Sequence, residues 1–291
     1  MNTRLNRPVQ AGQLCRELGL VMSGPDREIR AVGGLDSLDE HSLAFVRDRE
    51  PAPAATGTVF ARAPLDGRAL SVIVSASPRL DFIRAQHLLR ASPGFVEDAA
   101  PPELHPTVVV GRGAVVENGV RIGEGTRIGS GAVVKSGTLI GRFCEIEAGA
   151  VVGATGFGFE TGADGHPIKM LQLGGLRIGD HVEIGSLTTV CRGALGDTVV
   201  EDHVKIADHV HIGHNCRIGA GTMITACAEV SGSVTIGKKA WLAPNCSIMQ
   251  KVILGDGCFI GIGAVVLRGV PAGAKMFGNP AMRVVVPSVT A

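Results

Sequence analysis

The sequence of 291 residues contains no tyrosine and one tryptophan, and aromatic residues make up only 3% of it. This scarcity of large rings suits a narrow interior filled by small aliphatic side chains. No stretch approaches about 18 consecutive apolar residues, and the N-terminus has no apolar signal core, so we expect no transmembrane segment and a cytoplasmic location. The net charge of +1 gives no reason to expect nucleic acid as a partner.

The seven cysteines form no Cys-x-x-Cys pair, which argues against a disulfide framework or a redox motif. Four of them occupy small-residue positions of the repeat described next. We therefore expect these four cysteines to be reduced and buried. They are Cys144, Cys216, Cys246 and Cys258.

What the chain does contain is a repeat, because an aliphatic residue returns at every sixth position from Val110 to Val266, in 23 hexads with two interruptions. Hexapeptide periodicity is typical of a parallel β-helix, in which three faces close one coil of about 18 residues. Chance spacing in an ordinary β-sandwich is the alternative, and the unbroken run of hexads from Val200 argues against it. Glycine often follows the aliphatic residue, and we expect it at corners because it tolerates a positive φ.

The repeat divides the chain into three parts. Residues 1–104 show no hexads and alternate helical and strand signals, which predicts a small α/β domain. Residues 105–270 form the β-helix, and residues 271–291 form a short C-terminal tail. The elements that we expect in the first part are helices over Gln10–Leu20 and Pro78–Leu89 and strands over Ser42–Val46 and Leu70–Ser75.

Two segments interrupt the hexads. The first, Gly153–Arg177, is a glycine-rich excursion that carries Phe157 and Phe159. The second, between Val190 and Val200, is longer than one hexad and contains Arg192-Gly193-Ala194-Leu195-Gly196-Asp197. Long loops in a regular scaffold usually carry a function or contact a partner.

Four histidines are close together in the sequence: His203, His209, His211 and His214. No cysteine or carboxylate completes a known ligand spacing, so we predict no metal site. The simplest alternative for each histidine is a polar residue at a solvated corner. His203 and His209 are six positions apart, which places them on adjacent faces of the prism.

His214 has a distinctive context, because one coil of about 18 residues leads from it to Gly232. An imidazole can take a proton from an attacking amine or hydroxyl, and an exposed glycine N–H can stabilise the oxyanion of a tetrahedral intermediate. No activated serine or cysteine is evident, so the pair favours direct attack on a thioester over a covalent acyl-enzyme.

The run from Gly153 to Gly219 resembles the UDP-3-O-acylglucosamine N-acyltransferases of lipid A biosynthesis, most specifically in its Gly-Phe-Gly-Phe loop, its Arg-Gly-Ala-Leu insertion and its His-Asn pair. The resemblance also covers Leu43-Ala44-Phe45-Val46 and the Ser77-Pro78-Arg79 helix start. It implies a left-handed β-helix and a homotrimer with active sites between subunits. It also implies acyl transfer from acyl carrier protein to the 2-amino group of a UDP-glucosamine.

The resemblance assigns roles to single residues. It implies that His214 is the catalytic base and Gly232 the oxyanion glycine, in agreement with the coil spacing. Phe45 matches an aromatic residue that stacks on uracil, although its alternative is a core residue of its own strand. Asn215 is expected to position the substrate or the donor.

Some positions depart from the family pattern. His211 stands where a glutamine is expected to face the sugar, and Lys251 replaces a histidine near the diphosphate but keeps a possible positive charge. Cys191 and Ala207 stand where the family tends to carry aspartate. The residues Phe277-Gly278-Asn279-Pro280-Ala281 stand where the family has a helical extension and resemble the ending of hexapeptide acetyltransferases, which lies beside coenzyme A. Asn279 and Pro280 are therefore expected to line the donor site, or else to cap the β-helix.

Three hypotheses follow. The first is an N-acyltransferase that moves a 3-hydroxyacyl group from acyl carrier protein to a UDP-linked glucosamine-type sugar. The second is an N-acetyltransferase of a nucleotide-linked amino sugar that uses acetyl-CoA. The third is a non-catalytic β-helix that binds a sugar nucleotide or serves as a scaffold. We expect no permanently bound cofactor, with acyl carrier protein or acyl-CoA delivering the co-substrate.

Overall fold

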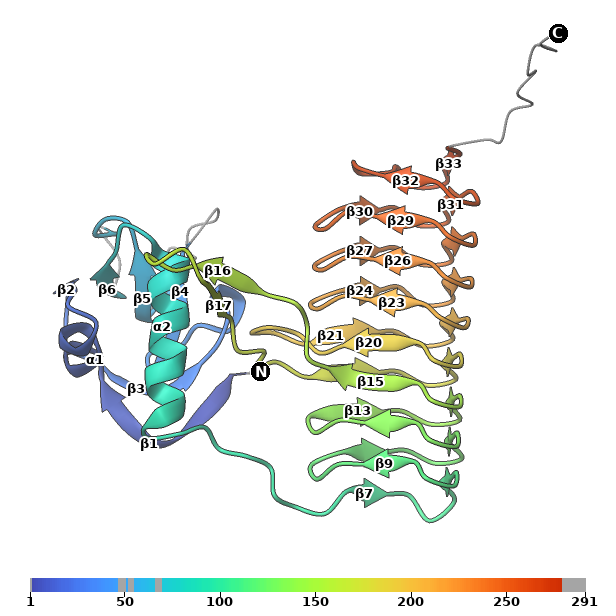
Figure 1. Ribbon diagram of the computed structural model, residues 1–291, viewed down its shortest axis with the longest axis horizontal. Coiled ribbons are helices and arrows are strands. Elements are labelled where there is room, and N and C mark those ends of the chain that lie inside the picture. Colours follow the sequence, from blue (N-terminus) through green and yellow to red (C-terminus); the bar gives the residue numbers. More distant parts are fainter. Residues whose placement is uncertain (1, 47–50, 52–54, 66–69, 279–291) are drawn as a thin grey trace, which may run out of the picture.

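The computed structural model describes residues 2–46, 51, 55–65 and 70–278, which form a small N-terminal domain beside a long solenoid (Figure 1). In the described part, the domain contains a six-stranded mixed sheet flanked by the helices α1 (Ala11–Glu17) and α2 (Pro78–Ala91), with a short 3-10 helix at Leu35–Ser37. Its strands, in spatial order, are β1 (Thr3–Gln10), β3 (Glu28–Val32), β4 (Ser42–Phe45), β5 (Gly57–Ala61), β6 (Leu70–Val74) and β2 (Val21–Ser23).

Both expected helices and both expected strands of this domain are present, but the sequence interpretation missed four strands. Strand β5 is buried at all five of its positions, so it lacks the alternation of polar and apolar residues that reveals a strand. Strand β1 is mostly exposed and also lacks that alternation. Pro78 opens α2, where its fixed φ suits the first helical turn, and the helix buries Phe82, Ile83 and Leu89 against the sheet.

The hexads form a parallel β-helix, as predicted, and it begins at Glu103, two residues before the predicted boundary. Across the described residues it has three parallel sheets, called here the first, second and third face. The first face contains β7 (Glu103–Leu104), β10 (Arg121–Ile122), β13 (Thr138–Ile140), β18 (Leu176–Ile178), β21 (Thr198–Val200), β24 (Arg217–Ile218), β27 (Thr235–Ile236) and β30 (Ile253–Leu254). The left-handed sense of the coil stays a prediction from the resemblance.

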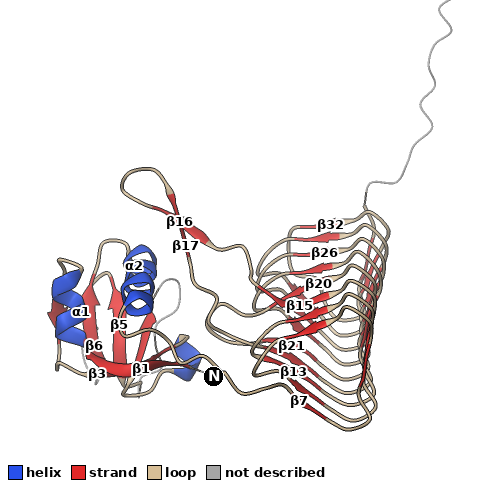
Figure 2. Ribbon diagram, turned by 60° about the horizontal axis from the view of Figure 1, so that its bottom comes forward, coloured by secondary structure: helices blue, strands red, loops and turns tan. Residues whose placement is uncertain are grey.

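The second and third faces complete each coil (Figure 2). The second contains β8 (Val109–Val110), β11 (Arg127–Ile128), β14 (Glu145–Ile146), β19 (Glu183–Ile184), β22 (Lys205–Ile206), β25 (Met223–Ile224), β28 (Trp241–Leu242), β31 (Phe259–Ile260) and β33 (Lys275–Met276). The third contains β9 (Val115–Val116), β12 (Val133–Val134), β15 (Val151–Ala154), β20 (Thr189–Cys191), β23 (His211–Ile212), β26 (Glu229–Val230), β29 (Ser247–Ile248) and β32 (Val265–Val266).

The hexad residues stack into ladders because each strand pairs in register with its counterpart in the next coil. Ile184, Ile212 and Ile248, for example, are at most 1% exposed. Val110 is 41% exposed because it lies in the first coil, at the open end of the prism. The four cysteines expected inside are buried and free, as predicted. Burying such a column supplies the core, at about 25 cal/mol for each Å² of apolar surface.

The prediction about glycine was wrong for most glycines that follow the hexad residue, since they have no positive φ, with Gly153 as an exception. A methyl group on Gly123 or Gly129 would instead meet the backbone of the next coil, 2.8 Å from Gly141 C or 2.6 Å from Ala148 N. These glycines let successive coils approach closely. The positive-φ position comes two residues later, where glycine is common and Gly125 has a φ of 67°.

Non-glycine residues also occupy these corners. His203 and His209 have φ values of 60° and 56°, and they lie at successive corners, as predicted. Coil stacking places His203 beside His181, with ring centroids 4.9 Å apart, and His181 beside Phe143, at 5.3 Å. His203 and His181 thus form part of a stack of rings along one corner of the solenoid.

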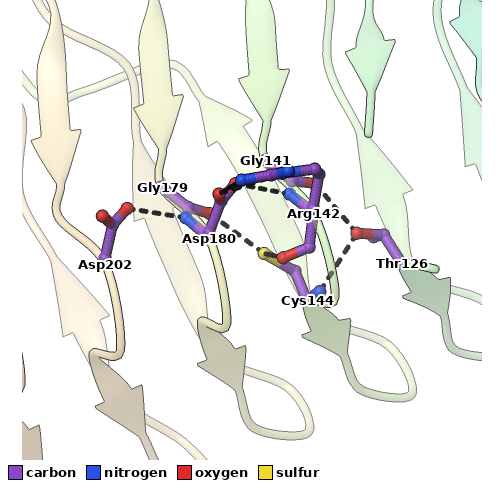
Figure 3. A network of polar contacts seen from close by, with 7 residues as sticks. All are labelled: Thr126, Gly141, Arg142, Cys144, Gly179, Asp180 and Asp202. Carbon is purple, nitrogen blue, oxygen red and sulfur yellow. Dashed lines mark hydrogen bonds and ion pairs between the residues drawn. The ribbon is translucent and has the colours of Figure 1, made fainter. Parts of the chain in front are cut away.

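Polar side chains hold the corners of neighbouring coils together (Figure 3). Asp180 accepts hydrogen bonds from the backbone N–H of Arg142, at 2.7 Å, and from its guanidinium, while Asp202 accepts one from Asp180 N–H at 2.8 Å. The Arg142 guanidinium and N–H hold the pKa of Asp180 below its ordinary value. In these two successive coils a carboxylate thus satisfies an N–H that the short strands leave unpaired.

The excursion connects the solenoid to the N-terminal domain (Figures 1 and 2). It leaves after β15, forms the antiparallel hairpin of β16 (Phe159–Thr161) and β17 (Pro167–Lys169) near α2, and returns at β18. Gln86 of α2 donates to Leu171 O at 3.3 Å and accepts from Leu171 N–H at 3.1 Å. Thr3 donates to Leu173 O, and Met170 belongs to the core of the domain.

Candidate active site

His214 lies at the corner between the third and first faces, after β23 and before β24. Its neighbour Asn215 holds the positive-φ position of that corner, with a φ of 60°, a conformation that asparagine tolerates better than most residues. Asn215 Oδ1 lies 3.0 Å from His214 Nδ1. The corner therefore places an amide beside the half-buried imidazole.

The contacts of Asn215 determine which way its amide faces. Its Oδ1 accepts a hydrogen bond from Ala194 N–H at 2.9 Å, and its Nδ2 donates to Gly196 O at 3.3 Å. The oxygen must therefore face His214, so Nδ1 of the neutral imidazole carries the hydrogen and donates it. The lone pair of the ring is then on Nε2, which is the nitrogen available to act as a base.

Gly232 lies directly against that nitrogen, one coil further on, as the spacing predicted. A methyl group on Gly232 would be 2.7 Å from His214 Nε2 and 2.9 Å from Cε1. Ser231 N–H donates to Ile248 O and Ser233 N–H to His214 O, whereas none of the described residues accepts a hydrogen bond from Gly232 N–H. A base and an unused backbone donor therefore lie close together.

The excursion covers the other side of the imidazole. A methyl group on the buried Gly156 would lie 2.8 Å from His214 Cβ and 3.0 Å from Cδ2. The next residue, Phe157, is 88% exposed and packs against Phe159 at 4.8 Å between ring centroids. The backbone of the Gly-Phe-Gly-Phe loop thus forms a wall of the site, and an exposed aromatic ring lies next to it.

The second interruption contacts the amide of Asn215 through Ala194 and Gly196, and polar contacts hold this interruption in place. Arg192 donates to Gly174 O at 2.6 Å, and burial lowers the pKa of this guanidinium although Glu117 and Asp197 oppose that effect. Asp197 accepts from Gly175 N–H at 2.9 Å and from Arg177 at 2.6 Å. These contacts tie the Arg-Gly-Ala-Leu insertion to the end of the excursion, so the two interruptions together form one support for the histidine.

The structure does not bring all predicted site residues to this corner. Phe45 ends β4 in the N-terminal domain, is half-buried, and packs on Phe82 at 4.9 Å between centroids. His211 is half-buried on the third face, in register with Thr189 and Glu229. The binding roles of Phe45 and His211 stay predictions.

Lys251 is exposed at the corner one coil beyond Ser233, and its backbone N–H donates to Gly232 O at 3.0 Å. Its role at a phosphate stays a prediction too. Asn279 and Pro280 lie outside the described residues. Cys191 is buried, which raises the pKa of its thiol to about 11. No group of three or more potential metal ligands occurs in the described part of the chain.

A groove of about 650 Å³ lies further along the solenoid and is lined by residues 249–253 and 267–269. Its apolar wall includes Met249, Ile253 and Leu267, which are 45%, 64% and 57% exposed. Lys251 and Arg268 add positive charge to its lining. Because Gln250 in this groove occupies the position of Gly232 one coil later, the groove begins one coil beyond the His–Gly pair.

Sequence reasoning located His214 and Gly232 by counting coils, but it missed Gly156, which lies against His214, and Gln172, which lies against Gly156. The glycine-rich excursion indicated function without indicating where its residues lie, because it is outside the hexad register. Among the described residues, no helix has the length and apolar character needed to cross a membrane.

Comparisons with known proteins add the family context. The family model described as bacterial transferase hexapeptide (six repeats) matches residues 101–136, 119–154, 197–232 and 233–268. The UDP-3-O-acylglucosamine N-acyltransferase of Delftia acidovorans is 36% identical over 89% of this chain and 83% of its own length. That of Herminiimonas arsenicoxydans is 32% identical over 93% and 86%.

A solved structure resembles the fold. The Francisella novicida UDP-N-acetylglucosamine acyltransferase aligns with a TM-score of 0.56 at 24% identity. The alignment covers 61% of this chain and 63% of that protein, so the chain spans a little under two thirds of its length.

Proposed function

Because the chain belongs to the family of the UDP-3-O-acylglucosamine N-acyltransferases, we propose that its His–Gly corner transfers a 3-hydroxyacyl group from a thioester to the 2-amino group of a UDP-linked glucosamine. The enzyme is an N-acyltransferase of lipid A biosynthesis. The observation that carries the proposed mechanism is the unused N–H of Gly232 beside Nε2 of His214.

The reaction follows from these two groups. The amine lone pair attacks the thioester carbonyl carbon, and His214 Nε2 takes the proton that the amine loses. The carbonyl oxygen becomes an oxyanion, which Gly232 N–H stabilises. When the intermediate collapses, the carbon–sulfur bond breaks and the imidazolium returns its proton to the departing thiolate. The products are an amide and a free thiol.

The groove supports a long acyl chain over an acetyl group. Its walls at Met249, Ile253 and Leu267 are apolar and partly exposed, so covering them with a hydrocarbon chain is favourable. An acetyl group would leave most of that surface in water. We therefore propose a 3-hydroxyacyl group on acyl carrier protein as the donor, and we propose that Lys251 meets the diphosphate of the UDP-linked acceptor.

The names of the relatives support the nucleotide-sugar acceptor, since both specify a UDP-linked acylglucosamine. We propose that Phe45 contacts the base and His211 the sugar. Phe45 lies on the N-terminal domain, so these contacts fit the proposal of a homotrimer whose sites lie between subunits. One side of the Phe45 ring packs on Phe82, so only the other side is available to the base. A cytoplasmic location completes the proposal.

A donor competition tests the reaction directly. Purified protein receives a UDP-linked amino-sugar mixture with both 3-hydroxyacyl carrier protein and acetyl-CoA, and the acceptor is analysed by mass spectrometry. We expect a mass gain equal to the hydroxyacyl group. A gain of one acetyl group would instead support the acetyl-CoA hypothesis.

The scaffold hypothesis predicts a different result for His214→Ala. A non-catalytic protein would show no turnover with either residue at this position. For the enzyme, removal of the base should lower kcat about 10²–10⁴-fold while the variant stays folded. Circular dichroism and the elution volume on gel filtration provide the controls for folding and assembly.

A further inference from the structure

A glutamine of the excursion lies against Gly156, the glycine that covers one side of the His214 imidazole. The two strands of the excursion stem run next to each other, since Met170 N–H donates to Gly158 O at 2.9 Å. Gln172 consequently lies near Gly156, where a methyl group would be 3.1 Å from Gln172 Oε1 and 2.8 Å from His214 Cβ. Gly156 thus lies between the imidazole and the amide oxygen of Gln172 and leaves no room there for a side chain.

That oxygen is buried and has no hydrogen-bond partner within the described chain. The other end of the amide fixes its assignment, because Gln172 Nε2 donates to Met170 O at 3.3 Å, and an exchange of the two atoms would set two oxygens against each other. A buried acceptor without a donor is unfavourable in the free protein and is rare in native structures. An unsatisfied acceptor beside a reaction centre indicates a ligand that supplies the donor.

The chain contains a second amide at the same stem for comparison. Gln86 is fully buried, and both of its amide atoms are satisfied by the backbone of Leu171. Gln86 therefore has a structural role that its hydrogen bonds explain, whereas nothing in the described fold accounts for Gln172 Oε1.

We infer that Gln172 is a specificity-determining residue whose Oε1 accepts a hydrogen bond from the non-reacting N–H of the acceptor amine. A neutral primary amine has one lone pair and two hydrogens. The lone pair attacks the thioester, the first hydrogen points to His214 Nε2, and the second is left for Gln172. A hydroxyl acceptor has one hydrogen, which His214 takes, so Gln172 stays unpaired and the hydroxyl is disfavoured. The inference rests on the proposed N-acyl transfer.

The amide can reach the amine by a small movement. The terminal torsion of glutamine has a broad profile, and the bond that holds Nε2 is long at 3.3 Å. The inference requires a turn about that torsion, because the amide oxygen now lies beside Gly156, on the Cβ and Cδ2 side of the imidazole, and has to move toward the Nε2 side to meet the amine.

The test compares an amine and a hydroxyl acceptor. The amine is UDP-3-O-acylglucosamine, for which kcat/KM is measured with 3-hydroxyacyl carrier protein. The hydroxyl compound is its 2-hydroxy counterpart, UDP-3-O-acylglucose, for which the inhibition constant against the amine is measured. For Gln172→Leu we expect kcat/KM of the amine to fall about tenfold to a hundredfold while the inhibition constant of the hydroxyl compound stays within about twofold. For Gln172→Glu, which keeps an acceptor oxygen, we expect a smaller loss with the amine than for the leucine variant.

Gln86→Leu is the matched control, and we expect it to lower the thermal midpoint without separating the two acceptors. Equal losses for both compounds in Gln172→Leu would show a merely structural role and overturn the inference, as would unchanged turnover of the amine. If the unaltered enzyme acylates no amine, the proposed function itself fails, which is a distinct result.

Discussion

Gly232 and His214 are in contact across two coils, and there is no room between them for a β-carbon: a methyl group on Gly232 would be within 3.1 Å of three ring atoms of His214. Glycine is thus required here for close approach, and its φ is not in the left-handed region. The same closeness brings the N–H of Gly232 to the base.

We therefore predict that Gly232→Ala lowers kcat/KM about 10²–10³-fold. The methyl group pushes the imidazole and the N–H of residue 232 apart, so the base and the oxyanion donor no longer act on the same intermediate. Steady-state kinetics measures the loss. Gly34→Ala is the control, since the nearest atom to its added methyl group would be 3.9 Å away. A Gly232→Ala enzyme with normal kinetics would exclude Gly232 N–H as the oxyanion donor.

Asn215 allows orientation to be separated from backbone strain. Asn215→Ala and Asn215→Gly both remove the acceptor that faces His214 Nδ1, so we predict that both lower kcat about tenfold to a hundredfold. Only the alanine variant also carries the strain of a positive φ, and it should be about 1–2 kcal/mol less stable than the glycine variant. Kinetics and urea denaturation measure the two effects. If the activity of the two variants differed only as their stability does, Asn215 would have no positioning role.

Asp197 makes the support of the site sensitive to acid. Burial by itself raises the pKa of this carboxyl, but Arg177 and the Gly175 N–H outweigh it and hold the pKa below its ordinary value. The stabilisation is therefore complete above the unfolded-state pKa of about 3.9 and is lost as pH falls through the lower folded-state pKa.

We predict that Asp197→Asn lowers the free energy of unfolding by about 1–2 kcal/mol at pH 7 and flattens its decline below about pH 4. Urea denaturation at a series of pH values measures both changes. An unchanged slope in acid would mean that other carboxylates control that decline.

The cysteines differ in access to solvent. Cys227 is exposed, whereas the other six are buried, and burial raises the pKa of the Cys216 thiol to about 12. Because the thiolate is the reactive form, we predict that iodoacetamide at pH 8 modifies Cys227 in the folded protein and all seven thiols after denaturation. Peptide mass spectrometry identifies the sites. Rapid labelling of Cys216 in the folded protein would contradict its burial.

The sequence was sufficient for the solenoid because a β-helix repeats one local rule. A hexad residue such as Ile212 needs only its counterparts in the adjacent coils, so periodicity specifies its burial and its neighbours. The same rule paired His214 with Gly232, 18 residues later. The position of Asn215 at a positive-φ corner and the need for a bare α-carbon at Gly123 depend on coil-to-coil contacts that the period alone does not show.

The excursion could not be predicted in the same way, because its residues leave the repeat. Gly156 and Gln172 reach His214 through a hairpin stem, and no fixed period relates their positions to it. Tertiary packing against α2 decides where that stem lies, through contacts such as that of Gln86 with Leu171. Phe45, likewise, shows a core contact in the structure that the alternative interpretation of the sequence anticipated.

The shared core of the N-terminal domain and the interruptions has a consequence for how such proteins can diversify. Met170 and Ala194 are buried among side chains of residues 5–89, so the domain and the wall beside His214 fold as one unit made of segments far apart in the chain. A chimera that exchanges residues 1–104 alone would set a foreign apolar surface against Met170. A changed domain therefore keeps this core only if the excursion changes with it, while the coils beneath can remain as they are.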